Sequence, residues 1–322
     1  MSARDVRAVT LFVLIACGLA WLVALPLWLG DGLASPLFIV IATAMMATPS
    51  VAALVVVFVV ERPSHRARAL GLWPMAPAGR LIGYLALGLV VPIVLAVAGL
   101  LVGALLGVYP ADFTGFSGFA QTLDEQLSAA GLPAVPIPIG VMVALQFVNI
   151  VVAAFLNLIP AFGEELGWRG WLLPKLLPLG TVPALLVSGL IWGLWHAPLV
   201  LLGYNYAGAP GWLALTMMCG MCVVVGGVLG WLRLRSESVW PAALAHGSLN
   251  AAVGSTMIMF VAADSTVDTT QATLLGWSGW IVPLVLIAVL LATGQFRPAR
   301  RAGDGGSGPA VSSGVPVQTA PR

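Results

Sequence analysis

Long runs of apolar residues, separated by short polar connections, dominate the chain. Each run is close to or longer than the ~20 residues that a helix needs to cross the hydrocarbon core of a bilayer, so each predicts a membrane-spanning helix. The runs lie at about Ala8–Leu29, Pro36–Val60, Leu81–Val108, Ile137–Pro160, Pro183–Leu202, Trp212–Leu232, Trp240–Ala262 and Leu275–Ala292. The predicted fold class is therefore all-α: a polytopic integral membrane protein with about eight transmembrane helices.

The composition agrees with this class and excludes others. Hydrophobic residues make up 60% of the chain and charged residues only 8%, which is far outside the range of soluble domains. A net charge of +2 is too small to indicate a nucleic acid partner. The three cysteines form no disulfide framework. Cys219 and Cys222 have the spacing of a redox or metal motif, but no histidine or acid lies near them in sequence. We interpret them as small residues that pack a helix.

Basic residues are confined to alternate connections, which places them all on one side of the membrane. They include Arg4, Arg7, Arg62, Arg66, Arg68, Arg80, Arg169, Lys175, Arg233, Arg235, Arg297, Arg300 and Arg301. The other connections carry Asp31, Asp112, Asp124, Glu125, Asp264 and Asp268, with no lysine or arginine. The positive-inside rule therefore predicts a multi-pass protein of the cell membrane with both termini in the cytoplasm. Arg66 and Arg301 are expected to face the cytosol, and Asp124 the opposite side.

Four segments follow from this pattern. Residues 1–135 hold the first three spans and their loops, 136–262 hold spans four to seven, and 263–296 hold the last span. Residues 297–322 are rich in glycine, serine, proline and alanine, which predicts a disordered cytoplasmic tail. The longest connection outside the membrane, 112–135, shows no sign of a folded domain.

Charged residues interrupt the apolar pattern between the fourth and fifth spans. Glu164, Glu165 and Arg169 stand there among long apolar runs, and ionisable groups at membrane depth indicate a functional site. On a helix, Glu165 and Arg169 are one turn apart and can form an ion pair, whereas Glu164 points about 100° away. The alternative is a buried ion pair that only fixes helix packing.

Two histidines occupy later spans. Trp192 precedes His196 by one helical turn, and His246 precedes Asn250 by the same distance. Either histidine alone is more typical of a helix contact. Together with the embedded acids they predict an active site in the interior of the bundle. Four tryptophans gather around these residues, as the wall of an apolar pocket or as ordinary core: Trp168, Trp171, Trp192 and Trp195.

These residues resemble the three motifs of the CPBP (Abi) family of intramembrane glutamic endopeptidases, which is related to the type II CAAX prenyl endopeptidases. The resemblance covers residues 137–260. Tryptophan replaces the phenylalanine of the second motif but keeps a large aromatic ring one turn before the histidine. The matches are Glu164, Glu165 and Arg169 to EExxxR, Trp192 and His196 to FxxxH, and His246 and Asn250 to HxxxN.

The resemblance implies a site inside the bilayer, open toward the cytosol, in which a glutamate and a histidine activate water for peptide hydrolysis. Glu164 is the expected general base and His196 helps to hold and deprotonate the water. His246 and Asn250 are expected to stabilise the oxyanion. Glu165, Arg169 and Trp192 are expected to support the site. The expected partners are the lipid bilayer and a membrane-associated peptide or protein substrate, lipidated or not.

Other mechanisms and functions remain alternatives. Two histidines and a glutamate are also plausible zinc ligands, but the chain has no HExxH helix and we favour a site without metal or other cofactor. A non-catalytic protein of the same fold could use the same residues as a proton-coupled transporter or bacteriocin-immunity factor. Against transport, the sequence shows no internal repeat.

Overall fold

The structure is a computed structural model that describes residues 1–75 and 77–296. The expected disordered tail, including Arg301, lies outside the described residues. Within them the chain forms helices and one isolated bridge between Ala111 and Val261, and no strand. The all-α prediction is therefore confirmed.

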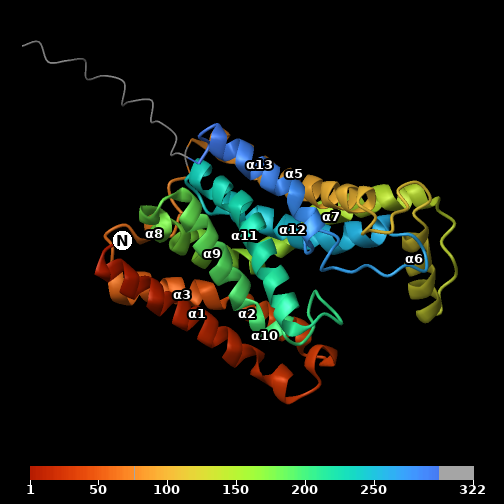
Figure 1. The fold of residues 1–322 in the computed structure, drawn as a ribbon, viewed down its shortest axis with the longest axis horizontal. Helices are drawn as coiled ribbons and strands as arrows, with labels where there is room; N and C mark the ends of the chain where they lie inside the picture. The colour runs from red at the N-terminus through yellow and green to blue at the C-terminus, as the bar shows by residue number, and fades with distance from the viewer. Residues whose placement is uncertain (76, 297–322) are drawn as a thin grey trace, which may run out of the picture.

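Thirteen α-helices are named in the described part of the chain (Figure 1). They are α1 (Ala3–Leu29), α2 (Phe38–Met46), α3 (Thr48–Val55), α4 (Arg66–Ala69), α5 (Ala78–Leu105), α6 (Ser117–Ala129), α7 (Ile139–Glu165), α8 (Leu173–Leu176), α9 (Thr181–Trp195), α10 (Ala197–Val200), α11 (Gly211–Ser236), α12 (Trp240–Phe260) and α13 (Ile281–Ala292). Two π-helical segments continue α3 and α7, namely η2 (Val56–Glu61) and η3 (Leu166–Leu172). Short 3-10 turns are η1 (Gly32–Ala34), η4 (Leu177–Leu179) and η5 (Trp277–Trp280).

Several helical segments can cross a membrane. Among the described residues, five are long and apolar enough: Ala3–Leu29, Phe38–Glu61, Ala78–Leu105, Ile139–Leu179 and Gly211–Ser236. This confirms a multi-pass membrane protein. The other three expected spans correspond to the shorter apolar segments Thr181–Trp195 and Trp277–Ala292 and to α12, which carries several polar side chains. The total of eight spans stays a prediction.

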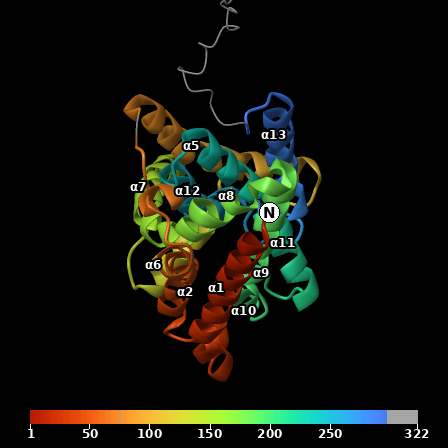
Figure 2. The ribbon, with the colours of Figure 1, turned by 90° about the vertical axis from the view of Figure 1, so that its left-hand side faces the viewer.

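Helix α12 lies at the centre of the bundle. It packs along α7 and α5 and also contacts α11, which in turn packs along α9. Helices α1 and α2 lie on one side of the bundle, and α5 and α13 lie on the opposite side (Figures 1 and 2). The N-terminal helices are therefore walls of the same bundle that holds the three motifs.

Small residues allow these helices to approach closely. A Cβ atom on Gly193 would lie 2.5 Å from the Cα atom of Cys219 on α11, and a Cβ atom on Gly247 would lie 2.6 Å from the carbonyl oxygen of Ala154 on α7. Any larger side chain would push the helices apart. Cys222 is a buried free thiol on the same face of α11, consistent with its interpretation as a packing residue.

The basic residues gather at one end of the bundle, which we call the basic end: the start of α1, the end of η2, α4, α8 and the end of α11. Lys175 Nζ lies 2.6 Å from Glu61 and 3.5 Å from Asp5. Arg233 Nε donates to the carbonyl oxygen of Arg169 at 3.0 Å. Connections that are far apart in sequence therefore meet here, as the alternation of charge requires. The face of the membrane that this end occupies stays a prediction.

The opposite end, which we call the acidic end, holds α6 and the connection between α12 and η5. Helix α6 joins that connection through Gln121, which donates to Asp264 at 3.1 Å. Hydrogen bonds from Ser117 and from the backbone N–H of Gly115 lower the pKa of Asp112 to about 2. Residues 112–135, in which the sequence shows no sign of a folded domain, contain the single 13-residue helix α6.

Candidate active site

The EExxxR motif lies where α7 passes into η3. Glu164 and Glu165 are the last two residues of α7, and every residue from Glu164 to Leu173 is buried. Close packing against the N-terminal helices explains this burial. A Cβ atom on Gly167 would lie 2.6 Å from the carbonyl oxygen of Pro49, and one on Gly170 would lie 2.7 Å from that of Leu70. Glycines thus allow the charged segment to lie directly against other backbone.

Glu165 is the hub of a buried charge cluster. Its Oε1 atom accepts hydrogen bonds from Arg169 Nη1 at 2.7 Å and from His246 Nδ1 at 2.9 Å. The side chains of Glu165 and Arg169 are 0% and 1% exposed, so water does not screen this pair. The second carboxylate oxygen of Glu165, Oε2, has no hydrogen-bond partner among the described residues. Glu165 therefore links the first motif to the third.

Arg169 has further contacts besides its ion pair with Glu165. Its guanidinium lies over the ring of Trp192, with Cζ 4.1 Å from the ring centroid. Its carbonyl oxygen accepts from Arg233. A Cβ atom on Gly226 would come within 3.0 Å of Arg169 Nη2, so the glycine makes room for the guanidinium. The spacing of Gly226 and Gly230 on α11 serves helix packing, because a Cβ on Gly230 would meet Leu185 of α9 at 2.6 Å.

Glu164 points to a different set of residues. Its Oε2 atom accepts from the indole N–H of Trp192 at 2.7 Å and from that of Trp168 at 3.3 Å. Its Oε1 atom makes no hydrogen bond to any described residue. The two adjacent acids therefore have separate surroundings: Glu165 binds Arg169 and His246, and Glu164 is fixed by two indoles, with one oxygen free of partners among the described residues.

His196 follows the end of α9. Its Nδ1 atom lies 2.9 Å from the carbonyl oxygen of Trp192. A carbonyl oxygen can only accept, so Nδ1 carries the proton and Nε2 is left as an acceptor. The imidazole also packs edge-on against Trp195, with centroids 4.7 Å apart. The backbone of the second motif thus determines the tautomer of its own histidine.

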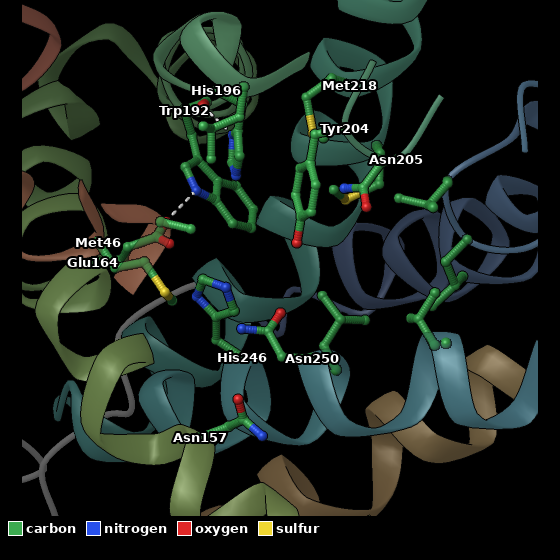
Figure 3. A pocket seen from close by; sticks show the side chains of 18 of the residues that line it. Met46, Asn157, Glu164, Trp192, His196, Tyr204, Asn205, Met218, His246 and Asn250 are labelled. Carbon is green, nitrogen blue, oxygen red and sulfur yellow. Dashed lines mark hydrogen bonds between the residues drawn. The ribbon is translucent and has the colours of Figure 1, made fainter. Parts of the chain in front are cut away.

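His246 and Asn250 project from α12 on the same face. Nδ1 of His246 is engaged by Glu165, and its ring packs edge-on against Trp192 at 5.3 Å. Asn250 is exposed and makes no hydrogen bond to any described residue. In Figure 3 the two side chains lie next to each other at the edge of an open space, opposite Trp192 and His196.

A cavity of about 550 Å³ connects these residues. Glu164, Trp192, His196, His246 and Asn250 all line it, while Glu165 and Arg169 lie behind them in the protein interior. The three motifs, separated by up to 86 residues in sequence, therefore meet around a single space. Of the tryptophan cluster, Trp192 and Trp195 line the cavity, whereas Trp168 and Trp171 are core residues packed against Phe12.

The cavity also contains residues that sequence analysis missed. The hydroxyl of Tyr204 points into the space toward Asn250 (Figure 3) and has no hydrogen-bond partner among the described residues. Asn157 lines the cavity from α7, two turns before Glu164, and that spacing is a signal that could have identified it. Tyr204 lies in the connection after α10, where no periodicity indicates which way a side chain points.

The cavity contains two histidines and a glutamate, which are donor types that zinc takes. Within residues 1–75 and 77–296, no group of three or more His, Cys, Asp or Glu side chains is arranged to hold a metal ion. Each site histidine already uses Nδ1 in a hydrogen bond. Zinc stays an alternative, because Nε2 of each histidine makes no hydrogen bond to any described residue.

Comparison with known families gives one match in this part of the chain. A family model described as type II CAAX prenyl endopeptidase Rce1-like matches residues 146–252. The matched segment runs from α7 into α12 and contains all seven motif residues. It supports the relationship to the CPBP and CAAX endopeptidases that the motifs indicated. A search of curated proteins gave no match.

Proposed function

Because the chain is related over residues 146–252 to the CAAX-type membrane endopeptidases, we propose that it is an intramembrane endopeptidase. Its substrate would be a membrane-associated protein or peptide. The observation that carries the proposal is the placement of Glu164 and His196 on one cavity. Each has an acceptor atom that makes no hydrogen bond to any described residue. A water molecule held between these two acceptors would be activated for attack.

In the proposed reaction, the water oxygen bonds to the carbonyl carbon of the scissile peptide while Glu164 takes the proton. The carbonyl oxygen becomes an oxyanion. Asn250 would stabilise it together with His246, whose ring, when protonated beside Glu165, donates from its cavity-facing Nε2. The carbon–nitrogen bond then breaks, and Glu164 returns the proton to the leaving amine. Glu165 and Arg169 would hold His246 and Trp192 in place and take no part in proton transfer.

The proposal predicts that the purified protein in detergent cleaves peptides and that His196→Ala cleaves them much more slowly. Loss of the imidazole acceptor is expected to reduce turnover by at least ~10²-fold, the lower range for a lost acid–base group. The measurement is mass spectrometry of a peptide mixture before and after incubation. His65→Ala is the matched control, because His65 is exposed in the connection before α4.

Equal cleavage by His196→Ala and the unmodified protein would contradict the assignment of this histidine. Absence of cleavage by the unmodified protein, across peptides with and without a lipid group, would favour the non-catalytic alternatives of an immunity factor or a transporter.

Chelation is expected to leave activity unchanged, because the proposed base and acceptors act without a metal ion. The test is to dialyse the purified protein against a strong chelator, measure its zinc content and compare the rate of peptide cleavage before and after. Stoichiometric zinc in the active protein, with activity lost on its removal and restored on its return, would replace the glutamate mechanism by a zinc mechanism.

A further inference from the structure

The cavity extends from the proposed catalytic residues toward the acidic end of the bundle. Part of its wall is the C-terminal half of α12, from Asn250 to Met257. The seven steps from one residue to the next along this stretch rise about 10 Å, which is the length of about three residues of extended peptide. The rest of this wall comes from two connections at the acidic end, through Tyr204, Asn205, Thr269, Leu274 and Leu275.

The way to the basic end is closed by protein. Trp168, Arg169, Trp171 and Leu172 lie between Glu164 and that end and are at most 1% exposed. Phe12 of α1 stacks on Trp171 with centroids 4.9 Å apart. A substrate chain cannot reach Glu164 through this packed layer without displacing several large aromatic side chains.

The cavity is open along one side. Four of its lining residues are themselves exposed: two on α2, Ile39 and Thr43, and two on α12, Asn250 and Gly254. Each pair is spaced by four residues, so each forms an exposed strip along one helix face. We call the opening between these two strips the mouth. The mouth leads from the proposed catalytic residues to the outer surface of the bundle. It lies on the side of the bundle, nearer to the acidic end than to the basic end.

We propose that the substrate peptide enters from the extracytoplasmic half of the membrane, through the mouth between α2 and α12. This inference rests on the proposed function and on the positive-inside rule, which places the basic end in the cytosol. The substrate class is then a membrane-embedded segment of an exported or membrane protein, cleaved near its extracytoplasmic end. This proposal differs from the expectation of a site open toward the cytosol, and the experiment below distinguishes the two.

The contents of the cavity fit such a segment. Its wall carries apolar side chains, among them Met218, Met221 and Val253, which suit the side chains of a membrane-embedded peptide. The amides of Asn157, Asn205 and Asn250 also line it. These amides offer hydrogen bonds to an extended peptide backbone, which needs partners because the bilayer interior provides none.

The test measures from which side the cavity is reached. Leu275→Cys places a thiol in the cavity near the acidic end. Arg66→Cys marks the basic end, and Asp124→Cys marks the acidic end away from the cavity. A bulky, membrane-impermeant maleimide is applied to intact cells and to inverted vesicles. The native chain, with its own three cysteines, sets the background.

The proposal expects Leu275→Cys and Asp124→Cys to be labelled in intact cells, and Arg66→Cys only in inverted vesicles. Labelled Leu275→Cys should also cleave peptide at least tenfold more slowly than before labelling, whereas labelled Asp124→Cys should not change. Labelling of Leu275→Cys only from the side that labels Arg66→Cys would overturn the proposal, as would unchanged cleavage after its complete labelling. If the labelling is as expected but the native protein cleaves nothing, the proposed function fails, and with it the substrate, while the position of the mouth stands.

Discussion

Replacing Glu164 with glutamine is expected to lower the rate of peptide hydrolysis by ~10²–10⁴-fold, the range for a lost general base, without unfolding the protein. The amide keeps a carbonyl oxygen that can accept from Trp192, which now donates to the carboxylate at 2.7 Å. It cannot take a proton from water. The measurement is single-turnover cleavage of a peptide, with thermal unfolding in detergent as the check on folding.

Glu125→Gln is the matched control for this substitution. Glu125 is an exposed glutamate on α6 at the acidic end, and among the described residues its carboxylate accepts only from Gln121. Its replacement should leave both rate and stability unchanged. Cleavage by a folded Glu164→Gln protein at the native rate would show that another group is the base, and the interpretation of the charged segment as a packing element would gain support.

Replacing Glu165 with glutamine should instead destabilise the fold. Arg169 is 1% exposed and has Glu165 as its ion-pair partner, so the substitution leaves a buried cation uncompensated. Breaking a buried pair in this way costs roughly 3–5 kcal/mol. His246 loses its charged acceptor in the same step. We expect a lower unfolding temperature, reduced expression and lost activity together.

The comparison for this prediction is Glu61→Gln. Glu61 pairs with Lys175, but the two side chains are 12% and 30% exposed, and partly solvated pairs contribute only about 0–1 kcal/mol. Glu61 also accepts from the indole N–H of Trp171 at 3.1 Å, and a glutamine oxygen can accept from the same donor. Unfolding followed by intrinsic tryptophan fluorescence should separate the two variants clearly. Equal unfolding temperatures for Glu165→Gln and the native protein would mean that the cation is compensated by other groups, such as Trp192.

The contacts within each motif could be predicted from sequence, because they depend only on helix geometry. The pairing of Glu165 with Arg169 follows from four-residue spacing. So does the shared face of His246 and Asn250. The same periodicity separated the two adjacent acids, and the structure places Glu164 on the cavity and Glu165 behind it. The catalytic roles given to these residues stay predictions.

Contacts between distant segments could not be predicted in this way. The hydrogen bond from His246 to Glu165 joins residues 81 positions apart, and the packing of Phe12 on Trp171 joins α1 to η3. Each depends on how whole helices are placed, which no local spacing specifies. The direction in which the cavity extends could not be predicted either, because Tyr204 and Leu275, which line it, lie in connections without periodicity.

Trp192 makes two contacts, of which a phenylalanine at this position could make only the first. Its ring face lies on the guanidinium of Arg169, and any large aromatic side chain offers such a face. Its N–H group, however, fixes one oxygen of Glu164, and phenylalanine has no donor there. With phenylalanine, the carboxylate would keep the N–H of Trp168 at 3.3 Å as its remaining donor and would rotate more freely. In this chain the second motif therefore restricts the rotamer of an acid that belongs to the first.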